Sequence, residues 1–371
     1  MDRGYIGLCN RNGSVLTTRI YLDHAATTPI RPEAAAAVID GMARWANPSS
    51  PHAEGRAARR ALEDARARIA TALGWDGEVI LTGGASEALA IALRGAGRYE
   101  TVVSAVEHDA VLRAAESDIR LPVGRGGLVD TDDRSWLLNA FDPREATQRF
   151  TIQSANSETG VLQPLDRIDA LRREAWVGRP ITLVADCSQS AGKLPLPPAD
   201  LIIVSAHKLG GPPGIGALLV RDLALLRPTG GQEQGYRGGT ENLPAALGFA
   251  AALEAPGDWF ARVTTLRTEL DRIVRAHGGE VIADASPRIP TIAAYRLPGR
   301  SAAAQLMRLD SAGFAVSAGS ACSSGTLKTS HVLTAMGIDA KAASEVIRVS
   351  FGWTTTTEDV ERFAEAWKAM A

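Results

Sequence analysis

The feature that most constrains the fold is the alternation of short apolar runs with longer, alanine-rich helical segments. The apolar runs are rich in β-branched residues and have the length of buried strands. Strands that alternate with helices along a chain form a mainly parallel sheet flanked by helices, so the pattern predicts an α/β fold. The predicted strands are Glu78 to Leu81, Thr101 to Ser104, Phe150 to Gln153, Ile181 to Ala185, Leu201 to Val204 and Ile215 to Val220.

A change of pattern near residue 255 predicts a second, smaller domain. Before it, residues 52–73 form an amphipathic helix that ends at Gly74, a residue type that favours helix C-termini. After it come a long helical stretch to His277, a strand at Thr291 to Leu297, a helix from Ser301, a strand at Ile347 to Phe351 and a final helix. We expect a large domain over residues 20–255, whose first residues can join the other domain, and a small α+β domain over residues 256–371.

The charge balance favours a small-molecule site over a nucleic-acid or membrane surface. The chain of 371 residues has 40 basic and 42 acidic residues, a net charge of −2, and therefore no large basic field. No apolar run approaches the roughly 18 residues of a membrane-spanning helix, and residues 1–19 lack the apolar centre of a signal peptide, so we expect a cytoplasmic protein. Cys9, Cys187 and Cys322 are an odd number of cysteines without close spacing, which supports neither a disulfide framework nor a metal site.

A lysine and an aspartate follow two of the predicted strands. Lys208 lies among small residues just past a buried strand, where partial desolvation lowers the pKa of its amine and makes it a nucleophile toward an aldehyde. Asp186 follows another apolar strand, and ligand crevices of open α/β sheets lie at the carboxyl ends of strands. A Schiff-base lysine with an aspartate for a pyridine nitrogen is the signature of a pyridoxal phosphate site. The plainer alternatives are a solvated loop lysine and an aspartate that caps a helix.

Two further loops carry residues that suit such a site. Residues 82–87 contain Gly83 and Gly84 between a strand and a helix, where backbone N–H groups and the helix dipole can hold a phosphate. A structural turn capped by Ser86 is the alternative. His108 follows another predicted strand, and an imidazole there can lie over an aromatic ring and move protons near neutral pH. Only the company of Lys208 and Asp186 distinguishes this histidine from an ordinary polar loop residue.

A thiol and a guanidinium complete the candidate residues. Residues 318–325 are all Ala, Gly or Ser except Cys322, a composition typical of a loop that can carry one thiol between two positions. The alternative is a buried structural cysteine, which fits Cys187 better because its neighbours are apolar. Arg348 lies inside an apolar strand, which favours contact with an anion such as a substrate carboxylate.

Eight motifs, in order along nearly the whole chain, resemble those of cysteine desulfurases. These enzymes belong to the class V aminotransferase group of fold type I pyridoxal phosphate enzymes. The resemblance implies a homodimer in which each chain has a large, mainly parallel-sheet domain and a smaller α+β domain. The motifs are Tyr21 to Pro29, Asn47 to Ser50, the Gly83 loop, Glu107-His108, Asp186 to Gln189, Ser205 to Lys208, Arg237 to Asn242 and Gly319 to Cys322.

The resemblance implies a role for each matching residue. Lys208 would bind the cofactor as a Schiff base, Asp186 would pair with the pyridinium nitrogen, and His108 would stack on the ring and move protons. Arg348 would hold the substrate carboxylate, with Asn156 beside it. The other implied cofactor contacts are Gln189 with the ring hydroxyl, Ala85, Ser86, Ser205 and His207 with the phosphate, Ser157 near the ring, and Thr240 reaching in from the other subunit.

The resemblance also implies the reaction and its partners. L-Cysteine would become L-alanine as the thiolate of Cys322 attacks the substrate sulfur, and the persulfide formed on Cys322 would pass to an acceptor protein. The acceptor would be an iron–sulfur scaffold or a tRNA-thiolation protein.

Three positions depart from the family pattern, and other activities stay open. Ser157 stands where the family usually has Asn, and Gly210 and Pro213 stand where it often has Tyr and Lys. A selenocysteine lyase, a cysteine sulfinate desulfinase or an aminotransferase of the same architecture is the alternative, and dependence on Cys322 discriminates among them. A non-catalytic binding module would have no physical need for Lys208 and Cys322 together.

Overall fold

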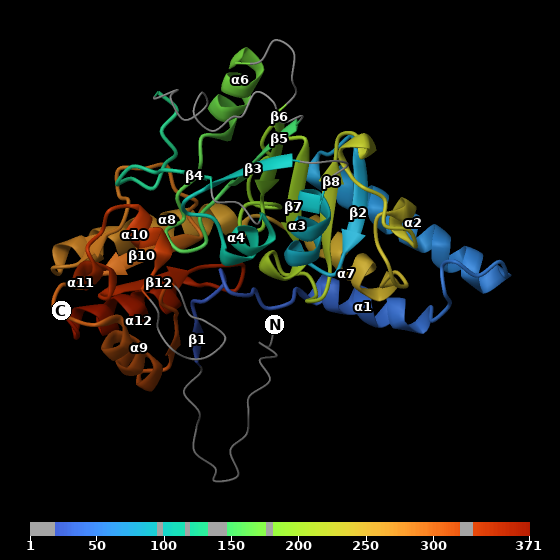
Figure 1. Ribbon diagram of the computed structural model, residues 1–371. Helices are drawn as coiled ribbons and strands as arrows, with labels where there is room; N and C mark the ends of the chain where they lie inside the picture. The colour runs from blue at the N-terminus through green and yellow to red at the C-terminus, as the bar shows by residue number, and fades with distance from the viewer. Residues whose placement is uncertain (1–18, 95–98, 116–118, 133–146, 176–180, 320–328) are drawn as a thin grey trace, which may run out of the picture.

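A mixed, mostly parallel sheet forms the centre of the computed structural model, which describes residues 19–94, 99–115, 119–132, 147–175, 181–319 and 329–371 (Figure 1). Within these residues, seven strands lie side by side in this sheet. The strand β8 is antiparallel to both of its neighbours, and all other neighbouring pairs are parallel. The order across the sheet is β2 (Glu78–Thr82), β8 (Gly216–Val220), β7 (Leu201–Ser205), β6 (Ile181–Asp186), β5 (Thr147–Gln153), β3 (Tyr99–Ser104) and β4 (Arg120–Leu121).

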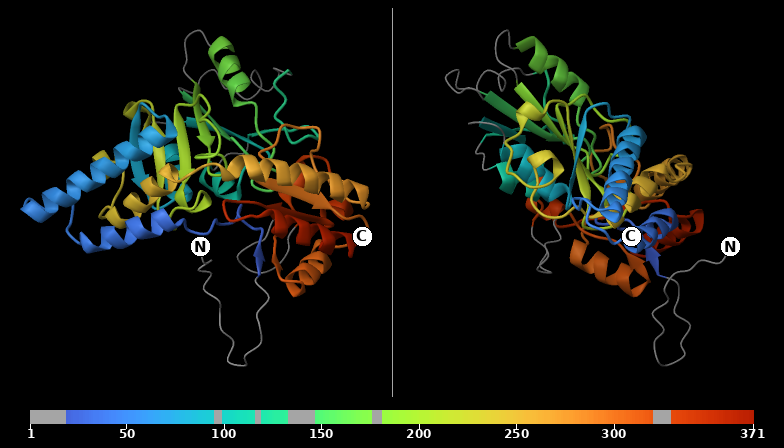
Figure 2. Two further views of the ribbon diagram at one scale, coloured as in Figure 1. Left: turned by 180° about the vertical axis from the view of Figure 1, so that it is seen from behind. Right: turned by 90° about the vertical axis from the view of Figure 1, so that its right-hand side faces the viewer.

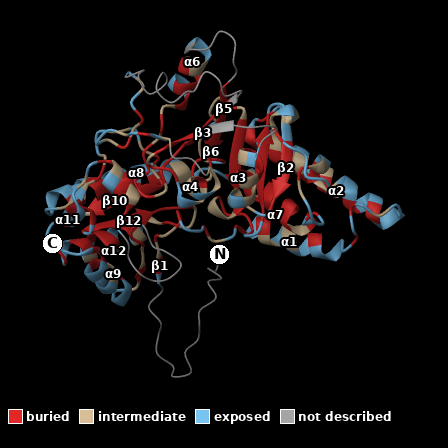
Figure 3. Cartoon of the chain, in the orientation of Figure 1, coloured by how far each residue is buried: buried red, intermediate tan, exposed pale blue. Residues whose placement is uncertain are grey.

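Helices cover both faces of this sheet, which explains why β7 and β8 are apolar along nearly their whole length. In β7, Ile202 and Val204 pack on one face, while Leu201 and Ile203 pack on the other. All four are buried, as Figure 3 shows for the sheet as a whole. Fully covered parallel strands read as continuous hydrophobic runs rather than as alternating ones. The first face packs against α2 (Ala53–Leu73), α6 (Leu165–Ala175) and α7 (Leu243–Glu254), with α1 (Pro32–Ala43) against α7; the second packs against α3 (Ala85–Arg94) and α4 (Asp109–Ala115).

The bounds of α2 follow from capping chemistry. The His52 side chain accepts a hydrogen bond from the backbone N–H of Gly55, which satisfies one donor of the first turn. The helix ends where Gly74 adopts φ 65°, the left-handed conformation that glycine adopts without a steric penalty. Both ends agree with the helix predicted over residues 52–73.

A smaller antiparallel sheet, in the order β12 (Val346–Ser350), β10 (Ile292–Arg296) and β9 (Glu280–Val281), lies beside the large one. Its core contains Tyr295, Phe363 and Trp367, and Figure 2 shows α8 (Trp259–Ala276) running along it. A short parallel pair joins β1 (Ile20–Tyr21) to β11 (Phe314–Ala315). The remaining helices here are α9 (Ala302–Ser311), α10 (His331–Ala335), α11 (Ala340–Ala343) and α12 (Thr357–Lys368).

The predicted fold class is confirmed, and the predicted strands agree closely with those observed. The two-residue strands β1, β4, β9 and β11 were not predicted, because so short a segment has no pattern of its own. The division into domains at about residue 255 stays a prediction, although separate apolar cores surround the two larger sheets. Among the described residues, no helix is long and apolar enough to cross a membrane.

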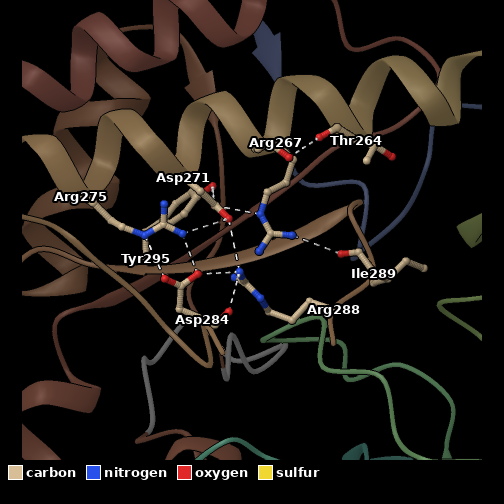
Figure 4. A network of polar contacts seen from close by, with 9 residues as sticks. Thr264, Arg267, Asp271, Arg275, Asp284, Arg288, Ile289 and Tyr295 are labelled. Carbon is tan, nitrogen blue, oxygen red and sulfur yellow. Dashed lines mark hydrogen bonds and ion pairs between the residues drawn. The ribbon is translucent and has the colours of Figure 1, made fainter. Parts of the chain in front are cut away.

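An ionic network around the buried Asp271 connects α8 to the segment that contains Arg288 (Figure 4). Asp271 Oδ1 accepts hydrogen bonds from Arg267 Nε (2.8 Å) and from the Tyr295 hydroxyl (2.7 Å), and Arg288 Nη2 lies 3.4 Å from Oδ2. Arg288 forms a bridge with Val161, in the loop that follows β5. The carboxylate of Asp271 thus joins the buried Arg267 of the helix to the partly buried Arg288 beside the loop.

Replacing Asp271 with Ala leaves the buried Arg267 guanidinium and the buried Tyr295 hydroxyl without their shared acceptor, while Arg288 keeps its pair with Asp284. We predict a loss of about 3–5 kcal/mol in the free energy of unfolding, measured by urea denaturation. Glu269→Ala is the control, because Glu269 pairs with Arg272 on the exposed face of the same helix. Equal stability of the two variants would contradict the role given to the network.

Candidate active site

A cavity of about 570 Å³ opens where several strands of the large sheet end. Gln153, Asp186 and Ser205 are the last residues of β5, β6 and β7, and all three line it. A cavity of this size suits a small organic ligand. The other lining residues are Gly83, Gly84, Ala85, Ser86, Glu87, Leu89, His108, Ala110, Ala155, Ser157, Ser188, Gln189, His207, Lys208, Pro213, Gly214 and Ile215.

Lys208 lies at the end of a short 3₁₀ turn, Ala206–Lys208, that directly follows β7. Its Nζ donates to the backbone oxygen of Ala25 at 2.8 Å. Burial, and then the charge of Arg348, lower the pKa of the lysine to about 8, against the opposing effects of Asp186 and Asp23. A sizeable fraction of the amine is therefore neutral near physiological pH, as a nucleophile requires.

Asp186 and Gln189 lie across the end of β6. Asp186 Oδ1 accepts hydrogen bonds from the backbone N–H of Ser188 (2.9 Å) and from its hydroxyl (2.6 Å), which fixes the carboxylate. Gln189 donates from Nε2 to the Ala25 oxygen at 3.0 Å. Gln189 Oε1 is buried and has no hydrogen-bond partner among the described residues. The Asp186 carboxylate thus caps the following turn and also lines the cavity. It can therefore serve both as a structural cap and as a partner of a ligand.

The loop between β2 and α3 forms the other end of the cavity. Gly84 has φ 141°, and α3 begins at Ala85, so that the free N–H groups of the first turn lie in the lining. Ser205 and His207 approach from the β7 end, and His207 Nδ1 lies 3.1 Å from the Thr27 hydroxyl. Burial, and then the charge of Lys208, lower the pKa of His207 to about 4. Backbone donors, a helix dipole and two polar side chains form a suitable anion site.

His108 lines the same cavity in a defined tautomer. The backbone N–H of Ala110 donates to His108 Nδ1 at 3.1 Å, so Nδ1 is an acceptor and the ring proton is on Nε2. Burial, and then the charge of Lys208, hold the pKa of His108 below its usual value. The imidazole is therefore neutral, as suits a ring that stacks on another ring.

Arg348 links β12 to the loop after β5. Its guanidinium donates to the Ser157 oxygen and to Asp23 Oδ1, both at 2.9 Å, and its Nε is buried without a partner among the described residues. A substrate carboxylate at this guanidinium would have to share it with Asp23.

Three predicted residues, Asn156, Thr240 and Arg348, are not among those that line the cavity. Asn156 is buried; its Oδ1 accepts from Glu158 and Thr159 in its own loop, and its Nδ2 donates to the backbone oxygen of Val106 in the turn after β3. Its expected contact with substrate is therefore not among those that we propose. Thr240 is exposed and does not line the cavity. Cys322 lies outside the described residues.

Sequence reasoning missed two groups that shape the site. The Ala25 carbonyl oxygen accepts from both Lys208 and Gln189, but a backbone oxygen has no residue-type signal. Asp23 pairs with Arg348, and a conspicuous arginine on an apolar strand could have prompted a search for its acidic partner.

The comparisons with known proteins identify the family. The aminotransferase class-V family model matches residues 20–363. The chain belongs to this family. A cysteine desulfurase of Cereibacter sphaeroides is 35% identical over 373 residues, which cover 94% of each chain. The predicted resemblance to cysteine desulfurases is thereby confirmed.

Two solved structures have the same fold. A NifS-like protein from Rickettsia africae matches with a TM-score of 0.85 and 30% identity, covering 95% of this chain and 99% of that chain. The structure of SspA in complex with cysteine matches with a TM-score of 0.76 and 29% identity, covering 90% and 99%. The likeness extends over almost the whole length of each protein.

The residues present fit pyridoxal phosphate, the cofactor of cysteine desulfurases in this class-V family. The buried Gln189 Oε1 lacks a partner, which a ring hydroxyl would supply. The anion site at α3 and Lys208 line the same cavity. A phosphate and an aldehyde on one ring would satisfy both.

The described cysteine outside the predicted loop is Cys187, whose burial suits a structural role. Its side chain is fully buried, and that burial raises the pKa of the thiol to about 12. We predict that iodoacetamide leaves Cys187 unmodified in the native protein at about pH 8 and modifies it after denaturation in urea. Peptide mass spectrometry measures both states. Modification of native Cys187 as fast as free cysteine would contradict its structural role.

Proposed function

We propose that this protein is a pyridoxal phosphate-dependent cysteine desulfurase that forms L-alanine and a persulfide on Cys322. The observation that carries the proposal is the placement of the Lys208 amine, Asp186 and the anion site around one cavity. The relatives named cysteine desulfurase favour this chemistry over the other activities of the family. The similar SspA structure is a complex with cysteine, which supports cysteine as the substrate class.

The described residues give the cofactor a set of partners. Ser86, Ser205 and His207, with the N–H groups of the first turn of α3, would hold the phosphate. Asp186 would pair with the ring nitrogen and Gln189 with the ring hydroxyl. When bound, pyridoxal phosphate supplies an aldehyde and an electron-withdrawing ring that stabilises negative charge at the substrate α-carbon.

Lys208 and His108 have different tasks in this proposal. Nζ of Lys208, with its pKa lowered to about 8, can attack an aldehyde as the free amine and can then carry a proton. His108 Nδ1 already accepts from the Ala110 N–H, so protonation there would break that hydrogen bond. His108 therefore acts as a stacking group and an Nε2–H donor. Proton transfer belongs mainly to Lys208.

Arg348 and Cys322 act on the substrate. Arg348 would hold the substrate carboxylate in exchange for part of its ion pair with Asp23. The Cys322 thiolate attacks the substrate sulfur, so that an S–S bond forms as the C–S bond breaks. The bonding electrons stay with carbon, which takes up a proton and leaves as alanine. One cysteine and one thiol give one alanine and one persulfide, without an external oxidant.

The partners belong to the same proposal. The exposed Thr240 would reach the cavity of a second copy in a homodimer, and the persulfide sulfur would pass to an acceptor protein of iron–sulfur assembly or tRNA thiolation. A relative from Dictyoglomus turgidum carries the name IscS, which supports sulfur transfer as the role. We place the protein in the cytoplasm.

The first test concerns the lysine. Lys208→Ala removes the amine that binds the aldehyde, so we predict loss of the visible absorbance of the lysine-bound cofactor and a fall of about 10²–10⁴-fold or more in cysteine turnover. Lys341→Ala, on α11, is the control and keeps both properties. A normal cofactor spectrum in the Lys208 variant would refute the assignment.

The second test concerns the thiol. In Cys322→Ser the described cavity is unchanged, so we predict that the cofactor absorbance stays normal while no persulfide forms after addition of L-cysteine. Mass spectrometry of the unreduced protein detects one added sulfur atom. Cys187→Ser is the control and gains that sulfur. Persulfide formation without Cys322 would reject its role.

A further inference from the structure

Glu107 carries a buried carboxyl group that contacts the cavity-lining residue Gln153 and for which the proposed reaction has no use. Its exposed fraction is 0%. Oε1 accepts from the Ser104 hydroxyl at 2.5 Å and from the backbone N–H of Gln153 at 3.0 Å. Oε2 is buried and has no hydrogen-bond partner among the described residues. The carboxyl group therefore lies across the ends of β3 and β5, next to the strand that ends in Asp186.

The surroundings of Glu107 differ from those of a buried ion pair. Within the described part of the chain, no lysine or arginine forms a salt bridge with Glu107. Glu233 shows the contrast, because Arg66 Nη1 and Nη2 contact its carboxylate at 2.5 and 3.0 Å. A fully buried carboxylate without a cation or a full set of donors is strongly disfavoured, whereas a neutral carboxylic acid is tolerated.

The turn that carries Glu107 joins the parts of the site. The Val106 oxygen accepts from Gln153 Nε2 at 2.5 Å and from Asn156 Nδ2 at 3.0 Å. The backbone oxygen of Glu107 accepts a hydrogen bond from His331 Nε2 of α10 at 2.9 Å. His108 follows directly in the chain and lines the cavity. A shift of this turn would therefore move both His108 and the lining residue Gln153.

The negative charge of Asp186 favours the neutral form of the Glu107 carboxyl group. Gln153 and Asp186 are register partners on adjacent strands, and the Asp186 charge acts on the Glu107 carboxyl. An ionised Glu107 would place a second negative charge beside Asp186, the residue assigned to the ring nitrogen. A neutral Glu107 adds no such charge.

We propose that Glu107 is a positioning residue of the cofactor pocket that works as a neutral acid, holding the His108 turn on β5 and adding no second negative charge beside Asp186. This inference rests on the proposed function for the identity of the cofactor. The contacts of the carboxyl group and of its turn support the positioning role independently of the cofactor.

A neutral Glu107 in the folded protein makes the free energy of unfolding depend on pH. Burial is the main cause that raises the pKa of Glu107, to about 8, whereas an exposed glutamate in the unfolded chain titrates near 4.5. Between these values the folded state keeps a proton that the unfolded state releases, so this residue lowers the free energy of unfolding as pH rises. The charged and titratable groups near its carboxyl and carbonyl groups are Asp186, His108 and His331.

The test compares Glu107→Gln with wild type as holoenzyme. Gln has the same shape and stays neutral, so its melting temperature relative to wild type should rise by about 2–5 °C between about pH 5 and about pH 8. Its visible cofactor absorbance and its KM for L-cysteine should match wild type. Glu107→Ala should lose cofactor absorbance, because the turn is no longer held.

Glu233→Gln is the matched control, since it neutralises a buried carboxylate that does have a cation. Its melting temperature should fall below wild type at every pH above about 6, through loss of the Arg66 pair. A Glu107→Gln variant that behaves like this control, or that loses cofactor absorbance, would overturn the proposal. A wild type that turns over no cysteine would refute the proposed function and leave the melting and absorbance measurements valid, because neither uses turnover.

Discussion

The coverage of the large sheet by helices on both faces is the constraint on which the rest of the structure depends. Because residues on both sides of β7 are buried in apolar cores, polar side chains on this strand can occur only at its end. Ser205 and the turn to Lys208 follow at that end, and Asp186 closes the neighbouring strand. The polar residues at the ends of β5, β6 and β7 therefore meet at the cavity.

The charges around the cavity then determine its chemistry. Lys208, Arg348 and the first turn of α3 present positive charge or dipole, while Asp186 and Asp23 supply the opposing carboxylates. The balance lowers the pKa of Lys208 to about 8, so that part of its amine is neutral and can act as a nucleophile. Glu107 remains outside that balance as long as it is neutral. A site with few carboxylates suits a ligand that brings a phosphate and a carboxylic substrate.

Much of this arrangement could be predicted from the sequence, because apolar runs mark covered strands and the polar residue after each run marks the cavity edge. The antiparallel direction of β8 could not be predicted, since a covered strand has the same composition in either direction. The role of the Ala25 carbonyl was equally hidden. The resemblance places Asn156 beside the substrate, yet its amide bonds to backbone groups of its own loop and to Val106 in the turn after β3, which only the fold reveals. Glu107 was visible as a neighbour of His108, but its burial depends on how β3 and β5 pair.

The most direct measurement of the central claim is the yield of alanine and sulfide from one sample. Purified protein loaded with pyridoxal phosphate is incubated with L-cysteine and a thiol reductant, beside the Cys322→Ser variant. Equal amounts of alanine and sulfide in the wild type, lost together in the variant, are the result that the account predicts. A normal cofactor spectrum without either product, or the same yield in the variant, would contradict it.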